Sequence, residues 1–174
     1  DKHVRNMQSF GQTVVIAFNK FATDTDEEIE VLRKHCEEMG CGFAVNSAFA
    51  EGGKGAMELA ELVVKTIDEH PSAPLYFTYD DDEPVEKKIE DVAFNLYGAG
   101  SVTLSDSAKS MIEEIKKLGA EKFPICIAKT QYSFSTDAKA YGPTEGFELH
   151  VRDITVNMGA EMIVVIAGPI MRMP

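Results

Sequence analysis

Basic residues are scarce in this 174-residue sequence. It contains 17 Lys and Arg against 29 Asp and Glu, which gives a formal net charge of -12 at pH 7. Proteins that bind the phosphate backbone of nucleic acids use clustered Lys and Arg to displace counterions, and anionic membranes attract the same kind of surface. The charge balance therefore argues against a nucleic-acid partner and against a membrane partner.

Long apolar runs and paired cysteines are lacking too. No uninterrupted apolar stretch is long enough to span a bilayer, and the opening residues "DKHVRNMQSF" contain no apolar core of a secretory signal. The three cysteines, Cys36, Cys41 and Cys126, are odd in number and lie in apolar-patterned contexts, which favours a reducing compartment. We therefore expect a cytoplasmic protein.

Neither common glycine-rich phosphate-binding pattern occurs: the sequence has no GxxxxGK[ST] and no GxGxxG. Its histidines are isolated, and no Ser/His/Asp or Cys/His grouping is suggested, so no catalytic residue is nominated. The chain begins without Met and stops at "GPIMRMP" directly after an apolar run. We therefore expect a piece of a longer protein.

Two groups of potential metal ligands have simpler interpretations. Cys36 and Cys41 have no second pair to complete a metal site, so core cysteines are favoured. The acidic run "DDDE" (80–83) precedes an expected helix, where the helix dipole and solvation account for carboxylates, and a divalent cation is the weaker alternative. No metal site is therefore predicted.

The first ~75 residues alternate strands with helices. "TVVIAFN" (13–19) is an apolar, β-branched run, typical of a strand buried on both faces. Thr25 and Glu28 form a capping-box pattern that predicts a helix, which Gly40 ends. "GFAVN" (42–46) predicts a second strand, and a helix with one apolar face follows. This order predicts parallel strands joined by crossover helices. The apolar face consists of Leu59, Ala60, Val63, Val64 and Ile67.

The pattern changes near residue 75. A helix is expected after Pro84, a short strand at "SVTL", and a further helix after the cap residue Ser105. "FELHVRDITVNMG" and "EMIVVIAG" follow each other without a helix between them, which indicates antiparallel neighbours. The predicted fold class is α/β. Residues 1–74 would form part of a parallel-sheet α/β layer, and residues 75–174 a smaller α+β domain with antiparallel strands.

Polar residues follow the first predicted strand in "NKFATDT" (19–25), where ligands of open α/β sheets bind. An Asn-Lys-x-Asp turn recognises guanine in P-loop GTPases, but Asp24 here stands two residues too far from Lys20. Both a base site and an ordinary strand-to-helix turn therefore stay open. "EGGKGA" (51–56) is similarly either an anion-binding turn ahead of a helix or a plain turn. Phe49 beside it is either core or a stacking platform for a flat ligand.

Several segments, taken in order, resemble the formate–tetrahydrofolate ligase family. "VVIAFNKFATDTDEE" resembles the family's strand followed by Asn-Arg/Lys-Phe-Pro-Thr-Asp-Thr, and "SAFAEGGKGAMELAELV" is similar to its Trp-Ala-x-Gly-Gly-x-Gly segment. The matching segments that follow are "PVEKKIEDVAFNLYGA", "FPICIAKTQYSFS", "GFELHVRDI" and "AGPIMRMP". The resemblance covers nearly the whole chain and corresponds to the C-terminal third of the family's proteins.

The resemblance implies a fragment of an ATP-dependent ligase. Residues 1–74 would then be the C-terminal part of its P-loop-like, nucleotide- and folate-binding α/β domain, without the P-loop itself, and residues 75–174 its C-terminal α+β domain. In the family, formate attacks the γ-phosphate of ATP, used with Mg, to give formyl phosphate, and the N10 amine of tetrahydrofolate then displaces phosphate to give 10-formyltetrahydrofolate. The family's phosphate loop and its basic residues lie in the N-terminal portion, so the fragment alone would be inactive. A homo-oligomeric parent is also implied. The alternatives are a non-catalytic binding or assembly module that retains the fold, and a degenerate half of a GTPase.

The resemblance also implies site residues. Phe21 and Phe49 would contact folate, although Phe49 replaces the family's usual Trp and offers less stacking area. Other departures are Ala22 and His150, each for a usual Pro, and Glu161 for a usual Gly; Glu161 would need a partner if it were buried. The implied nucleotide-binding residues are Asn19, Lys20, Thr23, Asp24, Gly52, Gly53 and Gly55.

Overall fold

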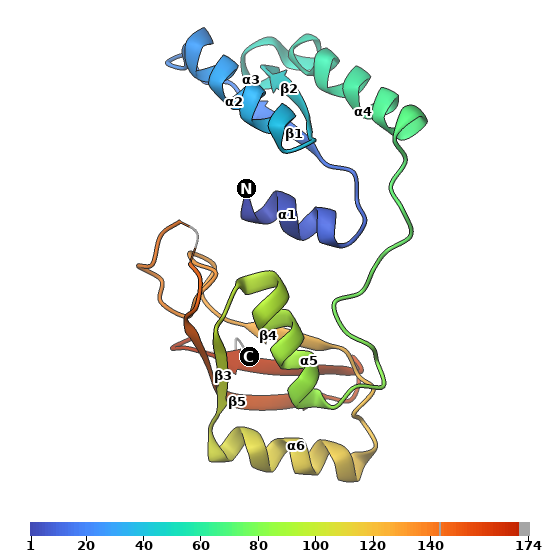
Figure 1. Ribbon diagram of the computed structural model, residues 1–174, viewed down its shortest axis with the longest axis vertical. Coiled ribbons are helices and arrows are strands. Elements are labelled where there is room, and N and C mark those ends of the chain that lie inside the picture. Colours follow the sequence, from blue (N-terminus) through green and yellow to red (C-terminus); the bar gives the residue numbers. More distant parts are fainter. Residues whose placement is uncertain (143, 171–174) are drawn as a thin grey trace. The chain divides into compact units, whose positions relative to one another are not determined.

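The computed structural model describes residues 1–142 and 144–170, which fall into two compact units, Asp1–Tyr76 and Phe77–Pro174 (Figure 1). Met171 to Pro174, the end of the "GPIMRMP" segment, lie outside the described residues. The first unit holds a two-stranded sheet and the second a four-stranded sheet. Within the described ranges, no helix has the length and apolar character needed to cross a membrane.

The first unit is built on two parallel strands, β1 (Val15–Asn19) and β2 (Gly42–Asn46), joined by helix α2 (Asp26–Glu38). The register pairs Asn19 with Asn46, so both strands end at the same edge of the sheet. The predicted capping box is confirmed: the Glu28 backbone N–H donates to Thr25 Oγ1 at 3.2 Å, and the Thr25 N–H donates to the Glu28 carboxylate at 2.9 Å. The parallel βαβ prediction is therefore confirmed for this unit.

Burial in the first unit is lower than the sequence pattern predicts. Ala17 in β1 is exposed and the other apolar residues of that strand are half-buried, because β2 is its only partner strand among the described residues. Helix α4 (Met57–Glu69) contains no buried residue, and the side chains of Val64 and Ile67 are about two-thirds exposed, at 60% and 64%. The prediction of a strand buried on both faces is therefore wrong for β1.

The glycine-rich segment after β2 folds into two short helical turns. Helix α3 (Ala48–Glu51) leads into the 3-10 helix η1 (Gly52–Ala56), which leads into α4. Gly52 adopts φ 61° and ψ -145°, a conformation that only glycine adopts readily. A Cβ atom on Gly55 would lie 2.4 Å from the carbonyl carbon of Ser47. The backbone geometry of this turn therefore explains both glycines without a ligand.

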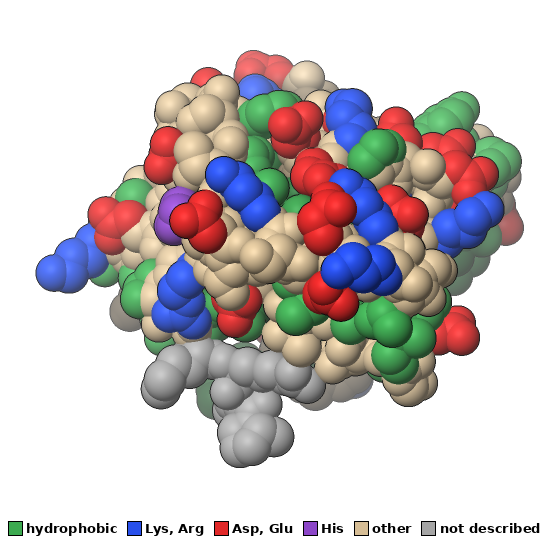
Figure 2. Space-filling view, turned by 90° about the horizontal axis from the view of Figure 1, so that it is seen from below, with side chains coloured by type: hydrophobic (Ala, Val, Ile, Leu, Met, Phe, Trp, Pro, Cys, Tyr) green, Lys and Arg blue, Asp and Glu red, His purple; other side chains and the backbone are tan. Residues whose placement is uncertain are grey.

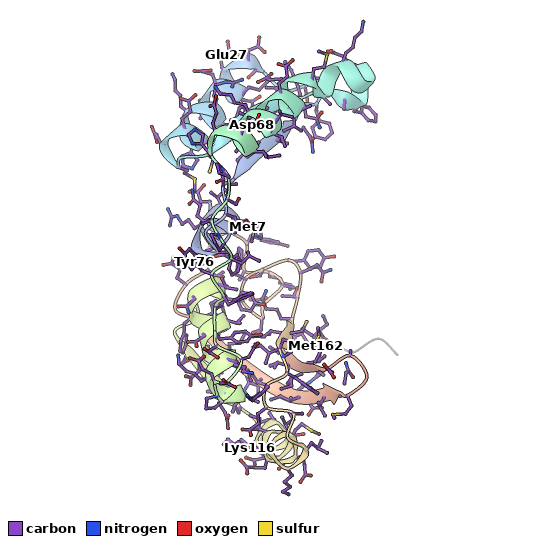
Figure 3. All side chains as sticks on the ribbon, turned by 90° about the vertical axis from the view of Figure 1, so that its right-hand side faces the viewer. Met7, Glu27, Asp68, Tyr76, Lys116 and Met162 are labelled. Atoms are coloured by element: carbon purple, nitrogen blue, oxygen red, sulfur yellow. The ribbon has the colours of Figure 1, made fainter. Side chains whose placement is uncertain are left out.

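Helix α1 (Lys2–Ser9) is held to the rest of the first unit by hydrogen bonds at its end. The Tyr76 N–H donates to the Phe10 carbonyl at 3.2 Å, and the Gln8 side-chain amide donates to the Met39 carbonyl at 2.9 Å. Figure 3 labels Met7 on this helix and Tyr76 on the segment beside it. These contacts join the start, the middle and the end of residues 1–76.

The second unit contains a mixed sheet in the order β3-β5-β6-β4. The hairpin of β5 (Glu148–Asn157) and β6 (Met162–Ala167) is antiparallel, which confirms the prediction for those two runs. β3 (Ser101–Leu104) pairs with β5, and β4 (Ile125–Ala128) with β6, in parallel. The expectation of antiparallel strands is therefore corrected to a mixed sheet, because β3 and β4 flank the hairpin in parallel pairings. The α/β class is confirmed.

Two helical segments help to form the core of the second unit. One is α5 (Val85–Asp91), which continues as the π-helix η2 (Val92–Tyr97), and the other is α6 (Asp106–Leu118), capped as predicted by the Ser105 hydroxyl. Their apolar stripes meet the sheet, as Ile89, Ile112 and Leu149 show by their burial. Acidic and basic side chains are interspersed on the face shown in Figure 2. On α6 itself, Lys117 pairs with Glu114 at 2.7 Å.

Glu161 lies in the turn of the β5–β6 hairpin, where it is exposed. The question of a buried carboxylate therefore does not arise. Its φ of 49° places it in the left-handed region, which costs a residue with a side chain more than it costs glycine. This conformation gives a physical reason for the Gly that the resemblance implies at this position.

Candidate functional site

Two exposed aromatic side chains follow the two parallel strands at the same edge of the sheet. Phe21 comes two residues after the end of β1 and is 69% exposed, and Phe49 comes three residues after the end of β2 and is fully exposed. Large apolar side chains left in water at the carboxyl ends of parallel strands are typical of a ligand-binding edge. The structure therefore excludes the core interpretation of Phe49 within the described residues.

The loop after β1 is ordered by Asp24. Its Oδ2 accepts a hydrogen bond from the Phe21 N–H at 2.7 Å, and the Asp24 N–H donates to the Phe21 carbonyl at 3.1 Å. Lys20 pairs with Asp26 at 3.2 Å, and Thr23 is exposed. Because Asp24 already uses one oxygen inside its own loop, a GTPase-like role in which it reads a guanine edge is disfavoured. Its clear role in the structure is to position Phe21.

The loop after β2 presents Phe49 on a braced turn. The Ser47 N–H donates to the Gly55 carbonyl at 2.9 Å, which closes the segment from β2 to η1. A Cβ on Gly53 would meet no atom within 4 Å, so that glycine, unlike Gly55, has no steric requirement in the described structure. Gly52, Gly53 and Gly55 therefore lie together in the turn that follows Phe49, with Gly53 the one that packing leaves unexplained.

Asn46 is the residue of this edge that the sequence analysis missed. Its Nδ2 donates to Asn19 Oδ1 at 2.8 Å, and its Oδ1 accepts from the Ala48 N–H at 3.2 Å, so it contacts both loops. A signal was present, because both strand segments, "VIAFN" and "GFAVN", end in Asn. The register of β1 and β2 pairs Asn19 with Asn46, so the two terminal Asn residues lie beside each other.

Acidic side chains line the hollow next to this edge. A groove of about 560 Å³ is lined by Phe18, Asp24, Glu27, Glu28, Val31 and Leu32. The pKa of Glu28 lies below its ordinary value, first because its carboxylate accepts the Thr25 backbone hydrogen bond and second because it accepts one from the Thr25 hydroxyl. The Glu28 carboxylate, which its hydrogen bonds hold in the charged form, repels phosphate, so this groove suits a neutral group better than an anion.

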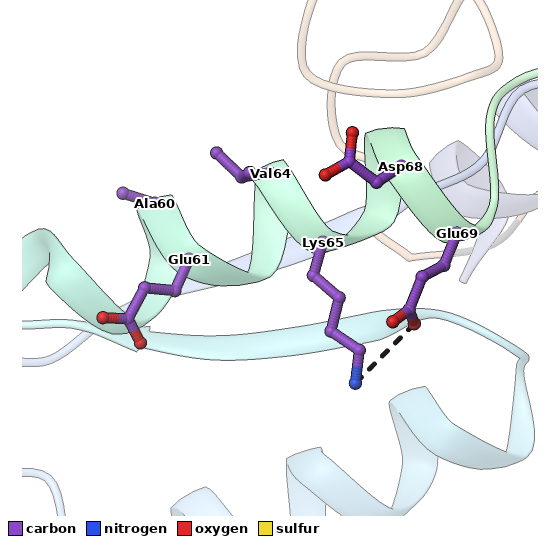
Figure 4. Close-up of a pocket in the computed structure, with 6 residues that line it drawn as sticks. All are labelled: Ala60, Glu61, Val64, Lys65, Asp68 and Glu69. Carbon is purple, nitrogen blue, oxygen red and sulfur yellow. Dashed lines mark ion pairs between the residues drawn. The ribbon is translucent and has the colours of Figure 1, made fainter.

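A second groove, drawn in Figure 4, runs along α4. It contains none of the predicted site residues, and its lysine and one of its acids pair with each other, Lys65 with Glu69 at 3.8 Å. Ala60 and Val64 line it together with Glu61 and Asp68. This mixture is that of a solvated helix face, and the groove is not assigned to the site.

No group of three His, Cys, Asp or Glu side chains that could hold a metal ion occurs in residues 1–142 and 144–170. Cys41 is buried, and burial, followed by the nearby Cys36, raises the pKa of its thiol. In the second unit, burial lowers the pKa of Lys129, whose ammonium donates to the Thr130 and Ser133 carbonyls.

The architecture defines the chain as an α/β protein whose candidate site stands at the carboxyl ends of two parallel strands. The family model described as formate–tetrahydrofolate ligase matches residues 1–174. The chain belongs to the formate–tetrahydrofolate ligase family. It is 62% identical to formate–tetrahydrofolate ligase of Bacteroides fragilis and 59% identical to that of Bacteroides thetaiotaomicron, over 174 residues in each case.

More distant relatives carry the same name. The formate–tetrahydrofolate ligase of Campylobacter concisus is 48% identical over 173 residues. These alignments cover 99–100% of the chain but only 31% of each relative's length. The chain therefore spans about a third of the proteins that it matches.

Proposed function

We propose that this chain is part of an ATP-dependent formate–tetrahydrofolate ligase and supplies the aromatic edge of its cleft for adenine and folate. The observation that carries the proposal is the pair of exposed aromatic residues, Phe21 and Phe49, at the ends of adjacent parallel strands. Adenine and the pterin ring of folate are both flat, and both stack on aromatic faces. Asn19, Lys20, Thr23, Asp24 and the 52–55 turn would surround them.

In this proposal, the groups that stabilise phosphoryl transfer are provided by the rest of the parent protein. When formate attacks the γ-phosphate of ATP, charge develops on the transferred phosphoryl oxygens, and Lys, Arg or Mg²⁺ must stabilise it. The sequence has no P-loop pattern, and Lys20 at the candidate edge is paired with Asp26. The chain would therefore contribute binding and orientation, and the parent's other portion would contribute the phosphate loop.

The exposed apolar faces of the first unit agree with the proposal that another portion of the parent protein packs against this chain. Val31 on α2 and Val64 and Ile67 on α4 are all at least 60% exposed. Large apolar side chains at this density are typical of surfaces that another part of a protein covers. In the parent ligase, the remaining portion would pack on these helices.

The test compares the full-length protein with the 174-residue chain. Each is purified and assayed for 10-formyltetrahydrofolate formed from tetrahydrofolate in the presence of formate and ATP. The proposal expects product from the full-length protein and none from the chain alone. Comparable turnover by the isolated chain, or no turnover by the full-length protein, would contradict it.

A further inference from the structure

Asn46 makes two hydrogen bonds to the end of β1 and the loop after it, and a third within the loop that follows β2. Its backbone carbonyl accepts from the Lys20 N–H at 3.0 Å, at the start of the loop that carries Phe21. Its side-chain Oδ1 accepts from the Ala48 N–H at 3.2 Å, at the start of the turn that carries Phe49. Its Nδ2 donates to Asn19 Oδ1 at 2.8 Å. The residue is therefore placed to set how both loops leave the sheet.

These bonds also determine the orientation of two amide side chains. A backbone N–H can only donate, so the atom of Asn46 that faces Ala48 must be the oxygen. The amine of Asn46 then faces Asn19. Because the NH₂ group of an amide only donates, the atom of Asn19 that accepts this hydrogen bond must be its oxygen. The Ala48 N–H can only donate, and this determines which end of each amide is the oxygen and which is the nitrogen.

The consequence for Asn19 is that its Nδ2 is the group left for a ligand. Asn19 is exposed at the end of β1, and among residues 1–142 and 144–170 nothing accepts a hydrogen bond from its Nδ2. Because the oxygen of Asn19 faces Asn46, its amine with two N–H donors points away from that partner, while the oxygen keeps one further lone pair. While the Asn46 bond persists, the amine is therefore the end of the Asn19 amide that is turned away from Asn46 and toward a ligand.

We propose that Asn46 is a positioning residue that fixes Asn19 as a hydrogen-bond donor, so that this edge selects an acceptor atom on a flat nitrogen heterocycle. The inference rests on the proposed function, which places adenine or pterin beside Phe21 and Phe49. Ring nitrogens of adenine and the ring nitrogens or carbonyl oxygen of pterin are acceptors of this kind. The kinetic constants for the two substrates distinguish which ring is bound there.

The first experiment uses Asn46→Asp in the full-length ligase. A carboxylate of almost the same shape still accepts from the Ala48 N–H but cannot donate to Asn19. Asn19 must then turn its amine toward the new carboxylate and its oxygen toward the ligand, so that two acceptors face each other. We expect the KM for one substrate, ATP or tetrahydrofolate, to rise roughly tenfold. The other KM, kcat and the thermal unfolding midpoint should change little, which a merely structural role would not produce.

A double-mutant cycle isolates the role of Asn19. In the Asn19→Ala background there is no Asn19 amide to reorient. The double variant Asn19→Ala/Asn46→Asp should therefore have the same KM for that substrate as Asn19→Ala alone. An equal rise in both backgrounds, or no rise in the presence of Asn19, overturns the inference. If Asn19→Ala raises a KM while Asn46→Asp does not, Asn19 contributes to binding, but the proposal that Asn46 fixes it as a hydrogen-bond donor is wrong. If Asn19→Ala and Phe49→Ala both leave every KM unchanged, the proposed site itself is wrong.

Discussion

The Oδ2 atom of Asp24 lies 2.7 Å from the backbone nitrogen of Phe21 and accepts its hydrogen bond. This bond folds the loop after β1 back on itself and holds Phe21 at the edge of the sheet. An acid that the sequence analysis assigned to nucleotide binding therefore has a structural task in the same loop. Its contribution to ligand binding would be exerted through Phe21.

Replacing Asp24 tests that task. Asp24→Ala removes the acceptor and should raise the KM for the substrate that stacks on Phe21 by about three- to tenfold, because a hydrogen bond of this kind contributes about 0.5–1.5 kcal/mol. Asp24→Asn keeps an acceptor oxygen and should stay near the wild-type value. Steady-state kinetics of the full-length ligase measure both. A large effect of Asp24→Asn, equal to that of Asp24→Ala, would show that the charge contacts the ligand directly.

The glycine turn offers a matched pair of substitutions. Gly55→Ala would place a Cβ 2.4 Å from the Ser47 carbonyl carbon, so Ser47 and the turn that carries Phe49 must move. Gly53→Ala meets no atom within 4 Å. We expect Gly55→Ala to lower the thermal unfolding midpoint and raise a KM, and Gly53→Ala to leave the midpoint unchanged. A rise in the KM for ATP with Gly53→Ala alone would support close approach of an anion to that glycine.

The capping box predicts a pH-dependent contribution to stability. The pKa of Glu28 is lowered in the folded protein from 4.5, so its contribution is complete above that value and is lost as the pH falls through the lowered folded pKa. Glu28→Gln should therefore lower the unfolding midpoint at neutral pH. The difference from wild type should vanish well below pH 4.5, where Glu28 is neutral in both states. A difference that is constant with pH would contradict this account.

Glu161 is predicted to be a suboptimal residue for its turn. Glu161→Gly relieves the cost of a side chain at φ 49° and should stabilise the protein by about 0.5–1 kcal/mol, net of the entropy that glycine loses on folding. The neighbouring substitution Ala160→Gly serves as the control, because Ala160 has no positive φ to relieve. Thermal unfolding should show a higher midpoint for the first variant only.

Local sequence patterns predicted where helices begin and end. They predicted burial and strand pairing less well. The capping box at Thr25, the end of the helix before Gly40 and the Ser105 cap depend on residues close in sequence, and each is confirmed. The two-sided burial of β1 depends on partner strands, which its own residues do not specify. The parallel pairing of β3 and β4 with the hairpin likewise depends on distant segments.

The same distinction applies to the candidate site. Phe49 could be nominated from the sequence because it stands beside the glycine-rich turn, whereas Phe21 was nominated by the resemblance alone. The structure places both at one exposed edge. Asn46 was missed although both strand segments end in Asn, because only the register shows that it lies beside Asn19. The nucleotide and folate roles of these residues stay predictions.

Phe49 provides the most direct test of the central claim, that this chain supplies the aromatic edge of a ligase cleft. The measurement is the KM of the full-length protein for tetrahydrofolate with Phe49→Ala and Phe49→Trp. Phe49→Ala should raise it about tenfold or more, the effect of losing roughly 1.4 kcal/mol of stacking, and Phe49→Trp should leave it equal or lower. Because Phe49 is fully exposed, neither change should alter the unfolding midpoint. Unchanged KM values for both variants would contradict the account.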